Sequence, residues 1–347
     1  MQKITRTIIT LLITLLLLLT LTTTPNSTTQ TTTDPFTIVW ISDTQYLSEN
    51  HPDHYINLCK WIAQNKDPYN IQMVVHTGDI VNSPDNTTQW ENANQSMNLL
   101  VANEIPYCWN AGNHDYTNAN SWIGSQYSAF NPQTFQLKPY WTDSYQNGMN
   151  TAVCFNMSNQ QWLIVNLAFH ADDSALNWTN DLLDAYPQAH AIVATHAYID
   201  RQCQYDFWAT KLKTTVLDTH NNVFLTLSGH YHPTDGNHTR AGERDELLFN
   251  QQDAHHQLGS SAARLLTFNP DQKTINIKTY NVFSNQYLQD PNNCFTIKTD
   301  FYNDITETDN PSFLIWLVGI LAVGICCCLV ILLTFVVGRR RLIYLQL

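Results

Sequence analysis

Basic residues are scarce in this chain of 347 residues, which has 17 Lys and Arg against 29 Asp and Glu. Five of the 17 lie near the ends, at Lys3, Arg6 and 339–341. The rest of the chain therefore has 12 basic residues against all 29 acids, a formal net charge of −17 with His neutral. Binding to nucleic acid through its phosphates needs a basic surface. The composition thus argues against nucleic acid as a partner.

Cysteine motifs are also absent, because no Cys-x-x-Cys pair occurs anywhere in the chain. Between residues 25 and 312 there are five cysteines: Cys59, Cys108, Cys154, Cys203 and Cys294. The missing motif argues against a cysteine zinc site, and the odd number leaves at least one cysteine unpaired. Cys59 and Cys108 lie in apolar patterns, which predicts buried thiols.

Two hydrophobic segments flank the rest of the chain. Residues 8–21 follow Lys3 and Arg6 and resemble a secretory signal, so we assign 1–24 to a signal peptide or an uncleaved signal anchor. Residues 313–337 contain no charge, and this length spans a bilayer as one helix. The arginines at 339–341 then place the tail, 338–347, in the cytoplasm. We expect a single-pass membrane protein with its main domain outside the cytoplasm, or two spans if the signal is retained.

The middle of the chain alternates predicted strands and helices, which is typical of parallel βαβ units. Residues 25–35 form a Thr-rich linker, 36–300 the folded domain, and 301–312 a short polar connection. Strands are predicted at 36–43, 71–79, 105–115, 151–157, 161–169, 190–198, 222–232, 262–268 and 274–282. Helices are predicted at 51–66, 86–103, 174–186 and 205–220. Residues 116–150 and 233–260 are predicted to be loops.

Polar residues gather where these strands end. The blocks are "SDTQ" with Asp43 and Gln45, "GDIVN" with Asp79 and Asn82, "GNHD" with Asn113, His114 and Asp115, "THAY" with His196, and "GHYH" with His230 and His232. In open α/β sheets, ligands bind beyond the carboxyl ends of the strands. We therefore expect the five blocks to meet around one crevice.

The chemistry of this set favours hard metal ions. It contains carboxylate, amide and imidazole groups and no thiolate, which suits cations that prefer oxygen and imidazole ligands. An aspartate can bridge two cations, and a pair of metals is a standard device for displacement at phosphorus.

The five blocks, in this order and spacing, resemble the calcineurin-like metallophosphoesterase superfamily over residues 36–282. The resemblance implies a four-layer α/β/β/α sandwich of two mixed sheets and a centre of two divalent metal ions (Mn, Zn or Fe). Carried over by position, Asp43, Gln45 and His232 would hold the first metal and Asp79 would bridge both. Asn113, His196 and His230 would hold the second.

The resemblance also implies that His114 is the catalytic histidine, which contacts substrate and protonates the leaving oxygen. Asp115 would orient it. Gln45 stands where many members have histidine, so the first site is expected to bind more loosely or to prefer manganese. Asn82 stands where purple acid phosphatases have a tyrosine, which disfavours that branch. It is either a supporting contact behind the metals or a plain turn residue.

Other polar residues have competing interpretations. His76 is expected in the core, and His255 and His256 in a solvated loop. His170 and Asp172 either line the substrate cleft or belong to the surface. Tyr46 and Tyr116, which follow metal blocks, either stack on a substrate or pack within loops.

We therefore expect a membrane-anchored, extracytoplasmic enzyme that hydrolyses a phosphomonoester or phosphodiester. Lipid head groups and scavenged small phosphoesters fit that location. The alternative is a surface-displayed binding or adhesion domain that keeps the fold without turnover.

Overall fold

The computed structural model describes residues 34–232, 236–252 and 260–299. The chain divides into two compact units, Met1–Tyr302 and Asn303–Leu347, and all the described residues belong to the first. The predicted signal segment, the membrane span at 313–337 and the cytoplasmic tail lie outside them. Within the described part of the chain, no helix has the length and apolar character of a membrane span.

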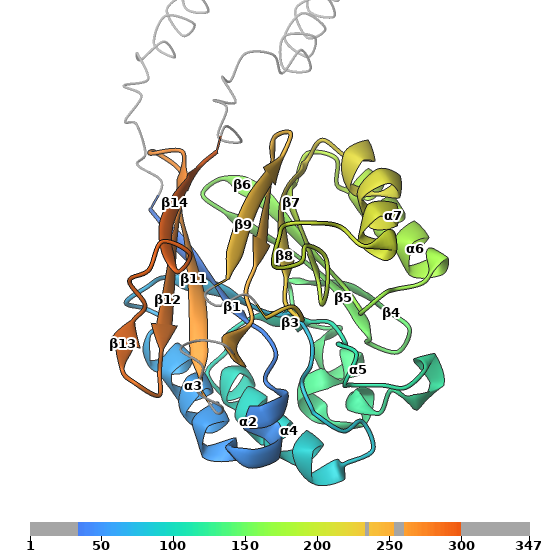
Figure 1. The fold of residues 1–347 in the computed structure, drawn as a ribbon, viewed down its shortest axis with the longest axis vertical. Coiled ribbons are helices and arrows are strands. Elements are labelled where there is room, and N and C mark those ends of the chain that lie inside the picture. The colour runs from blue at the N-terminus through green and yellow to red at the C-terminus, as the bar shows by residue number, and fades with distance from the viewer. Residues whose placement is uncertain (1–33, 233–235, 253–259, 300–347) are drawn as a thin grey trace, which may run out of the picture. The chain divides into compact units, whose positions relative to one another are not determined.

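The first sheet combines strands from both ends of the described chain, with the order β13-β12-β11-β1-β2-β3 and with β14 beside β12 (Figure 1). These strands are β1 (Phe36–Ile41), β2 (Ile71–His76), β3 (Tyr107–Trp109), β11 (Ala262–Asn269), β12 (Thr274–Asn281), β13 (Gln286–Tyr287) and β14 (Cys294–Lys298). β1, β2 and β3 are parallel, whereas β11 runs antiparallel to β1. The sheet is therefore mixed.

The second sheet has the order β4-β5-β6-β7-β8-β10-β9. Its strands are β4 (Trp141–Tyr145), β5 (Asn150–Met157), β6 (Gln160–Leu167), β7 (His190–Thr195), β8 (Val223–Ser228), β9 (Asn237–Ala241) and β10 (Arg244–Leu248). β6, β7, β8 and β10 are parallel to one another. The pairs β4–β5, β5–β6 and β10–β9 are antiparallel. β5 and β6 form a hairpin that closes at Ser158 and Asn159, whose φ angles of 54° and 60° fit a tight two-residue turn.

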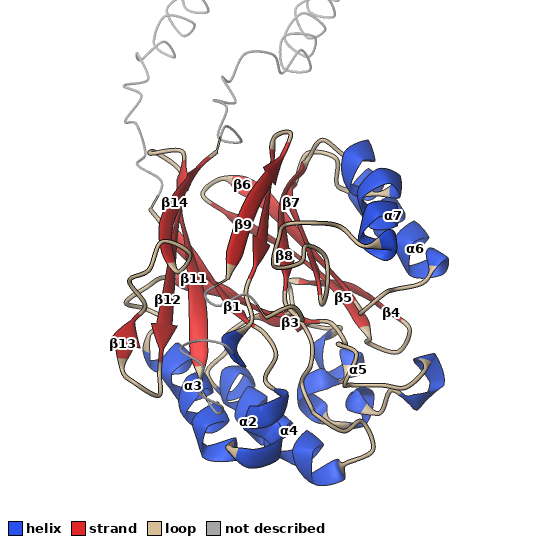
Figure 2. Cartoon of the chain, in the orientation of Figure 1, coloured by secondary structure: helices blue, strands red, loops and turns tan. Residues whose placement is uncertain are grey.

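Helices lie on the outer faces of the sheets (Figure 2). The α-helices are α2 (Gln45–Asn50), α3 (Pro52–Gln64), α4 (Thr87–Ala102), α5 (Pro132–Phe135), α6 (Asp173–Ala185) and α7 (Phe207–Thr215). The 3₁₀ turns are η1 (Ala119–Ser121), η2 (Gly124–Gln126), η3 (Ser128–Phe130) and η4 (Leu217–Thr219). Side-chain oxygens of Asn86, Asp172 and Asp206 cap the first turns of α4, α6 and α7, which satisfies backbone N–H groups that a helix start leaves free.

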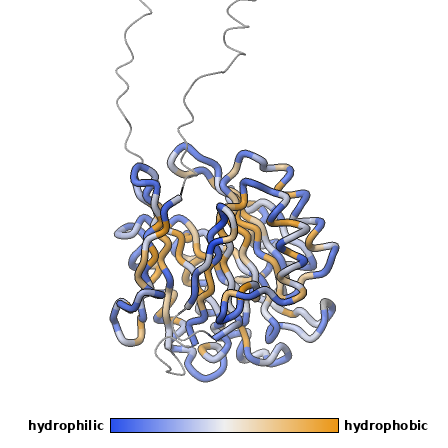
Figure 3. Tube along the Cα trace, turned by 45° about the horizontal axis from the view of Figure 1, so that its top comes forward, coloured by the Kyte–Doolittle hydropathy of each residue, from blue (hydrophilic) through white to orange (hydrophobic). Residues whose placement is uncertain are grey.

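Three hydrophobic clusters hold these layers together. One lies between the sheets, one joins the first sheet to α3 and α4, and one joins the second sheet to α6 and α7. β1 shows how a strand serves two of them, because Ile38 and Trp40 pack between the sheets while Val39 and Ile41 pack toward the helices. Figure 3 shows the same pattern, with hydrophobic residues along the strands and hydrophilic loops around them. The prediction of two mixed sheets with helices is confirmed.

Several elements escaped the sequence prediction. The segment 116–150 contains α5 and β4 in addition to loop, and 233–260 contains β9 and β10. The helix predicted at 205–220 ends as α7 at Thr215 and continues as a 3₁₀ turn. The prediction for the cysteines was better, since Cys59 and Cys108 are buried free thiols.

Candidate metal centre and active site

The site is assembled where β1, β2, β7 and β8 end, and backbone hydrogen bonds tie these ends together. The N–H of Asp43 donates to the carbonyl of Gly78 at 3.0 Å, and the N–H of Gly229 donates to the carbonyl of His196 at 2.8 Å. Asp43, Asp79 and His230 have φ angles of 53°, 52° and 64°. Such left-handed conformations are uncommon for residues other than glycine and gather at functional sites. At each of these positions the turn directs the side chain toward the centre.

Two glycines make room for the carboxylates. A Cβ atom on Gly112 would lie 2.2 Å from both the backbone nitrogen and Oδ1 of Asp79. A Cβ atom on Gly229 would lie 2.4 Å from Oδ2 of Asp43. The glycines of "GNHD" and "GHYH" are therefore required by close approach to Asp79 and Asp43.

The centre of the site is a cluster of Asp79, His196 and His230, whose ligand atoms all lie within 4.8 Å of one another. Nε2 of His196 lies 3.3 Å from Oδ2 of Asp79 and 3.0 Å from Oδ1 of Asn113. Nδ1 of His196 donates to the carbonyl of Thr77 at 2.8 Å, because a carbonyl oxygen can only accept. Nδ1 thus carries a proton, and Nε2 is the nitrogen that faces Asp79 and Asn113 and that would bind a metal after losing its own proton.

Asp43 ends a chain of buried hydrogen bonds that all run in one direction. The indole N–H of Trp40 donates to Oγ1 of Thr77 at 2.9 Å, and Thr77 donates to Oγ of Ser42 at 2.7 Å. Ser42 in turn donates to Oδ2 of Asp43. The backbone N–H of His230 also donates to this carboxylate, at 3.2 Å to Oδ1. All these donors favour the ionised carboxylate, with Oδ2 held by Ser42 and Oδ1 facing His230.

Gln45 lies beside Asp79 and is almost fully buried. Its Nε2 donates to Oδ2 of Asp79 at 3.1 Å. Its Oε1 is buried and has no hydrogen-bond partner among the described residues. A buried amide oxygen without a partner costs free energy unless something else binds it, and a hard cation is a suitable ligand for amide oxygen. The residues present therefore fit a metal ion.

The electrostatics of the site also favour a bound cation. Burial and the neighbouring Asp79 raise the pKa of Asp43 to about 7, although His196 opposes this shift. Burial alone would lower the pKa of His196, but Asp79 and Asp43 raise it to about 9. Burial would raise the pKa of Asp79, yet His196 and His114 lower it overall. Two buried acids thus compete for one positively charged imidazole, and added cations would relieve that competition.

His114 and Asp115 have separate partners. Nδ1 of His114 lies 3.0 Å from the carbonyl oxygen of Asn82, and its backbone N–H donates to Oδ1 of Asp79 at 2.9 Å. Asp115 instead accepts three backbone N–H groups, from Ile80, Val81 and Gly112, at 2.7–2.9 Å. The expectation that Asp115 orients the His114 ring is therefore wrong.

The reason for this correction is local geometry. Asp115 is fully buried, and its carboxylate closes the turn that carries Asp79 onto the turn that carries Asn113. The backbone of Asn82 takes the orienting role, and its side chain donates to Glu49 at 2.9 Å. Asn82 thus supports the site from behind through its main chain.

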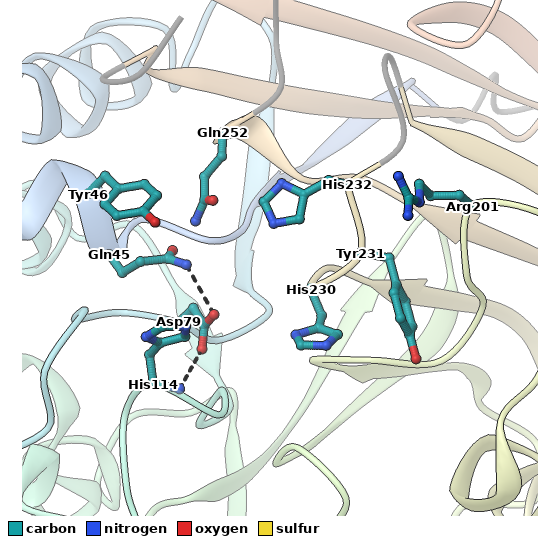
Figure 4. Close-up of a pocket in the computed structure, with 9 residues that line it drawn as sticks. All are labelled: Gln45, Tyr46, Asp79, His114, Arg201, His230, Tyr231, His232 and Gln252. Atoms are coloured by element: carbon teal, nitrogen blue, oxygen red, sulfur yellow. Dashed lines mark hydrogen bonds between the residues drawn. The ribbon is translucent and has the colours of Figure 1, made fainter. Parts of the chain in front are cut away.

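A pocket of about 260 Å³ opens beside the cluster and is shown in Figure 4. Its lining residues are Gln45, Tyr46, Asp79, His114, Arg201, His230, Tyr231, His232 and Gln252. In this view Gln45, Tyr46 and His114 lie on one side, Arg201 and Tyr231 lie on the other, and the two histidines lie between them. The predicted His232 therefore faces the same pocket as Gln45 and Asp79.

The structure places most of the polar residues that had two interpretations. His76 is fully buried, accepts from the N–H of Gly78 at 3.1 Å and lies 2.9 Å from Oγ1 of Thr44, which confirms a core histidine. Tyr46 lines the pocket, whereas the hydroxyl of Tyr116 donates to the carbonyl of Phe169. The other residues with a predicted cleft or loop position were His170, Asp172, His255 and His256. His170 pairs with Asp206 at 3.2 Å and Asp172 caps α6, while 255 and 256 lie outside the described residues.

Sequence reasoning missed Arg201, Tyr231 and Gln252 in the pocket and Ser42 and Thr77 behind it. The last two carried a usable signal, because each directly precedes a "D" or "GD" block at the end of a buried strand. Arg201 carried none, since it stands in a polar loop with no periodic pattern.

The model of the family described as calcineurin-like phosphoesterase matches residues 36–234 of this chain. That range is more than half of the chain, and the chain belongs to the calcineurin-like phosphoesterase family. Metal-dependent hydrolysis of phosphoesters is the activity this membership suggests, and the Asp79 cluster is where the described residues could hold a metal.

Among curated proteins, the chain is similar to "Uncharacterized protein YvnB" of Bacillus subtilis (strain 168), with 30% identity over 282 residues. The match covers 79% of this chain but 21% of that protein, so this chain spans about a fifth of its relative's length. The additional length of the relative has no counterpart in the match.

Two solved structures are similar to this chain at low identity. GAP50, described as the anchor in the inner membrane complex of Plasmodium, has a TM-score of 0.50 at 12% identity, over 76% of this chain and 88% of that one. The purple acid phosphatase PPD1 from yellow lupin (Lupinus luteus) seeds has a TM-score of 0.49 at 13% identity, over 77% of this chain and 54% of that one. The likeness to GAP50 concerns the fold alone.

Proposed function

We propose that this chain hydrolyses phosphoesters with two divalent metal ions, on a domain that membrane segments display outside the cytoplasm. The observation that carries the proposal is the buried Oε1 of Gln45, which has no partner among the described residues. It stands beside the cluster of Asp79, His196 and His230 and in the same pocket as His114. A site that served only to stabilise the fold would have no use for a buried oxygen without a partner.

Residues of all five blocks would hold the two metals between them. Asp43, Gln45 and His232 would hold the first ion, and Asn113, His196 and His230 the second. Asp79 would be shared, because it lies within contact of residues from both sets. When bound, such a pair of ions polarises the phosphoryl oxygens and acidifies a water molecule.

His114 would handle the proton of the leaving group. The carbonyl of Asn82 fixes the proton of the imidazole on Nδ1, so Nε2 is the nitrogen available to a substrate in the pocket. A protonated Nε2 can donate to the departing oxygen, as a general acid must. The hydrogen bond from its backbone N–H to Asp79 holds His114 at a fixed position relative to the cluster.

The location part of the proposal rests on the sequence. The uncharged stretch at 313–337, followed by three arginines, supports a span with a cytoplasmic tail. The membrane would then be a partner of the chain, and lipid head groups or small external phosphoesters would be the substrates within reach. A protease added to intact cells should degrade the domain, with permeabilised cells as the reference. Protection of residues 36–300 in intact cells would invert this topology.

The activity is tested on the purified full-length chain. The protein is stripped with a chelator, reloaded with manganese, zinc, iron or calcium, and assayed with 4-nitrophenyl phosphate and bis(4-nitrophenyl) phosphate. We expect metal-dependent turnover that Asp79→Asn abolishes and Asp143→Asn, an exposed acid on β4, retains. Metal analysis accompanies each assay. Two bound ions without turnover of either ester would favour the binding-domain alternative, and no bound metal would refute the assignment of the site.

A further inference from the structure

One residue of the pocket has no role in the centre described above. Arg201 lines the pocket beside Tyr231 and His232, and its side chain is exposed to solvent. Among the described residues its guanidinium forms no hydrogen bond and no ion pair. It is also the only Lys or Arg among the residues that line this pocket, in a chain where acids far outnumber bases.

The loop that carries Arg201 is held firmly. Ile199 and Tyr205 form an isolated β-bridge across its base. The carboxylate of Asp200 accepts the N–H groups of Gln202 and Gln204, each at 2.8 Å. This acid is therefore occupied by its own loop, although it is the sequence neighbour of Arg201.

A second contact fixes the position of Arg201 itself. Nδ2 of Asn237 donates to the backbone carbonyl of Arg201 at 2.9 Å, which ties the loop to β9. The same loop begins at His196, a candidate metal ligand five residues earlier. The backbone thus presents a cation to the pocket from a preorganised position, which lowers the entropic cost of binding a ligand.

The charge and placement of Arg201 define what it would bind. Guanidinium binds phosphate and carboxylate groups with paired, charge-assisted hydrogen bonds. In Figure 4 it lies across the pocket from Gln45 and His114, so it does not share their side of the site. We propose that Arg201 binds a second anionic group of the substrate, remote from the phosphoryl group that is hydrolysed. The inference rests on the proposed phosphoesterase function and narrows its substrate class to phosphoesters with a further negative charge.

The test compares three probes that differ only at the end remote from the ester. They are propane-1,3-diol monophosphate, 3-phosphooxypropanoate and propane-1,3-diol bisphosphate, which end in a hydroxyl, a carboxylate and a phosphate. Phosphate release by the manganese-loaded full-length chain gives kcat and KM for each. The quantity of interest is kcat/KM for an anionic probe divided by kcat/KM for the hydroxyl probe, because this ratio cancels general effects on folding and metal content.

Arg201→Gln should lower this ratio roughly 10- to 100-fold, mainly through KM, because a charge-assisted hydrogen bond is lost. Arg201→Lys keeps the charge without the paired geometry. Its ratio should lie between those of the wild type and Arg201→Gln. The matched control is Arg240→Gln on β9, an exposed arginine outside the pocket, which should retain the wild-type ratio. A fall for both anionic probes would define the group as any anion, and a fall for the bisphosphate alone would define it as phosphate.

Other outcomes would overturn the inference. If Arg201→Gln lowers kcat/KM equally for all three probes, Arg201 acts on the hydrolysed phosphoryl group itself. If no ratio changes, the arginine does not contact the substrate. If the wild-type enzyme hydrolyses only diesters, the three compounds are compared as inhibitors of bis(4-nitrophenyl) phosphate turnover, with the same expected ratios. A metal-loaded wild type that hydrolyses neither the probes nor that diester refutes the proposed function, and the inference then falls with it.

Discussion

The side-chain amide of Gln45 donates to Oδ2 of Asp79 over 3.1 Å, and this contact leaves its own oxygen buried and unbonded within the described part of the chain. The amide nitrogen must face Asp79, because the opposite orientation would bring an oxygen against a carboxylate. Gln45 therefore both steadies the proposed bridging ligand and offers an oxygen to the proposed first metal.

This relationship predicts how metal preference depends on residue 45. Gln45→His should tighten zinc binding at the first site, because imidazole is a stronger ligand for zinc than an amide oxygen. Gln45→Leu should lose the first metal while the cluster of Asp79, His196 and His230 keeps the second. Titration calorimetry with zinc and manganese on the chelator-treated chain measures both effects. Unchanged affinity in Gln45→Leu would show that residue 45 binds no metal.

The hydrogen bonds behind Asp43 lead to a second prediction. Ser42→Ala removes the hydroxyl that donates to Oδ2 of Asp43 and should weaken metal binding roughly tenfold, as expected for one hydrogen bond to a charged group. Thr77→Val removes the next donor in the chain and should have a smaller effect. Titration of manganese into each variant gives the order. Equal affinities in the wild type and both variants would mean that Asp43 is positioned without them.

Close packing at Gly112 leads to a third prediction. Gly112→Ala places a methyl group 2.2 Å from the backbone nitrogen and Oδ1 of Asp79, so the turn that carries Asp79 must move. The variant should lose about 1–3 kcal/mol of unfolding free energy, the usual cost of overpacking, together with most of its metal affinity. Gly242→Ala is the comparison for metal binding: a Cβ there meets nothing within 4 Å, and its φ of 64° strains alanine, so it should lose unfolding free energy through the backbone but keep its metal content. Denaturant unfolding and metal content check both, and normal metal content in Gly112→Ala would contradict the close approach.

The central strands and the residues at their ends could be predicted from sequence because both signals are local. An apolar run such as 71–75 predicts a buried strand, and the turn after it places Asp79 at the sheet edge where parallel strands meet. β10 could not be found in this way. It carries Arg244, Asp245 and Glu246 at buried positions, and its charges are satisfied by partners elsewhere, such as Asp218 and His238.

The role of Asp115 shows a second limit of the sequence. Its adjacency to His114 suggested a catalytic pair, yet consecutive residues point in different directions. Two backbone N–H groups from the turn of Asp79 and one from its own turn, that of Gly112, reach its carboxylate. Which N–H groups these would be depends on how the turns meet in space, and that information is not contained in any one motif.

The buried His76 leads to a prediction about pH. Burial lowers its pKa to about 3, and the positive charge of His196 lowers it further than Asp79 raises it. A histidine whose pKa is lower in the folded state stabilises the fold above its unfolded pKa of about 6.5, and this stability is lost as the pH falls from there toward 3. Replacing His76 should therefore remove part of the acid sensitivity of the protein.

The variant for this test is His76→Gln, which retains polar atoms near Thr44 and the N–H of Gly78. Urea unfolding at pH 6.5 and pH 5.0, with chelator present, gives the loss of free energy over that interval. A proton bound only by the unfolded chain costs up to about 1.4 kcal/mol per pH unit. The unfolded histidine is half protonated at pH 6.5, so the wild type should lose about 1.6 kcal/mol more than the variant. If both proteins lose the same free energy, His76 is protonated in the folded state or accessible to solvent, and its assignment to the core would be wrong.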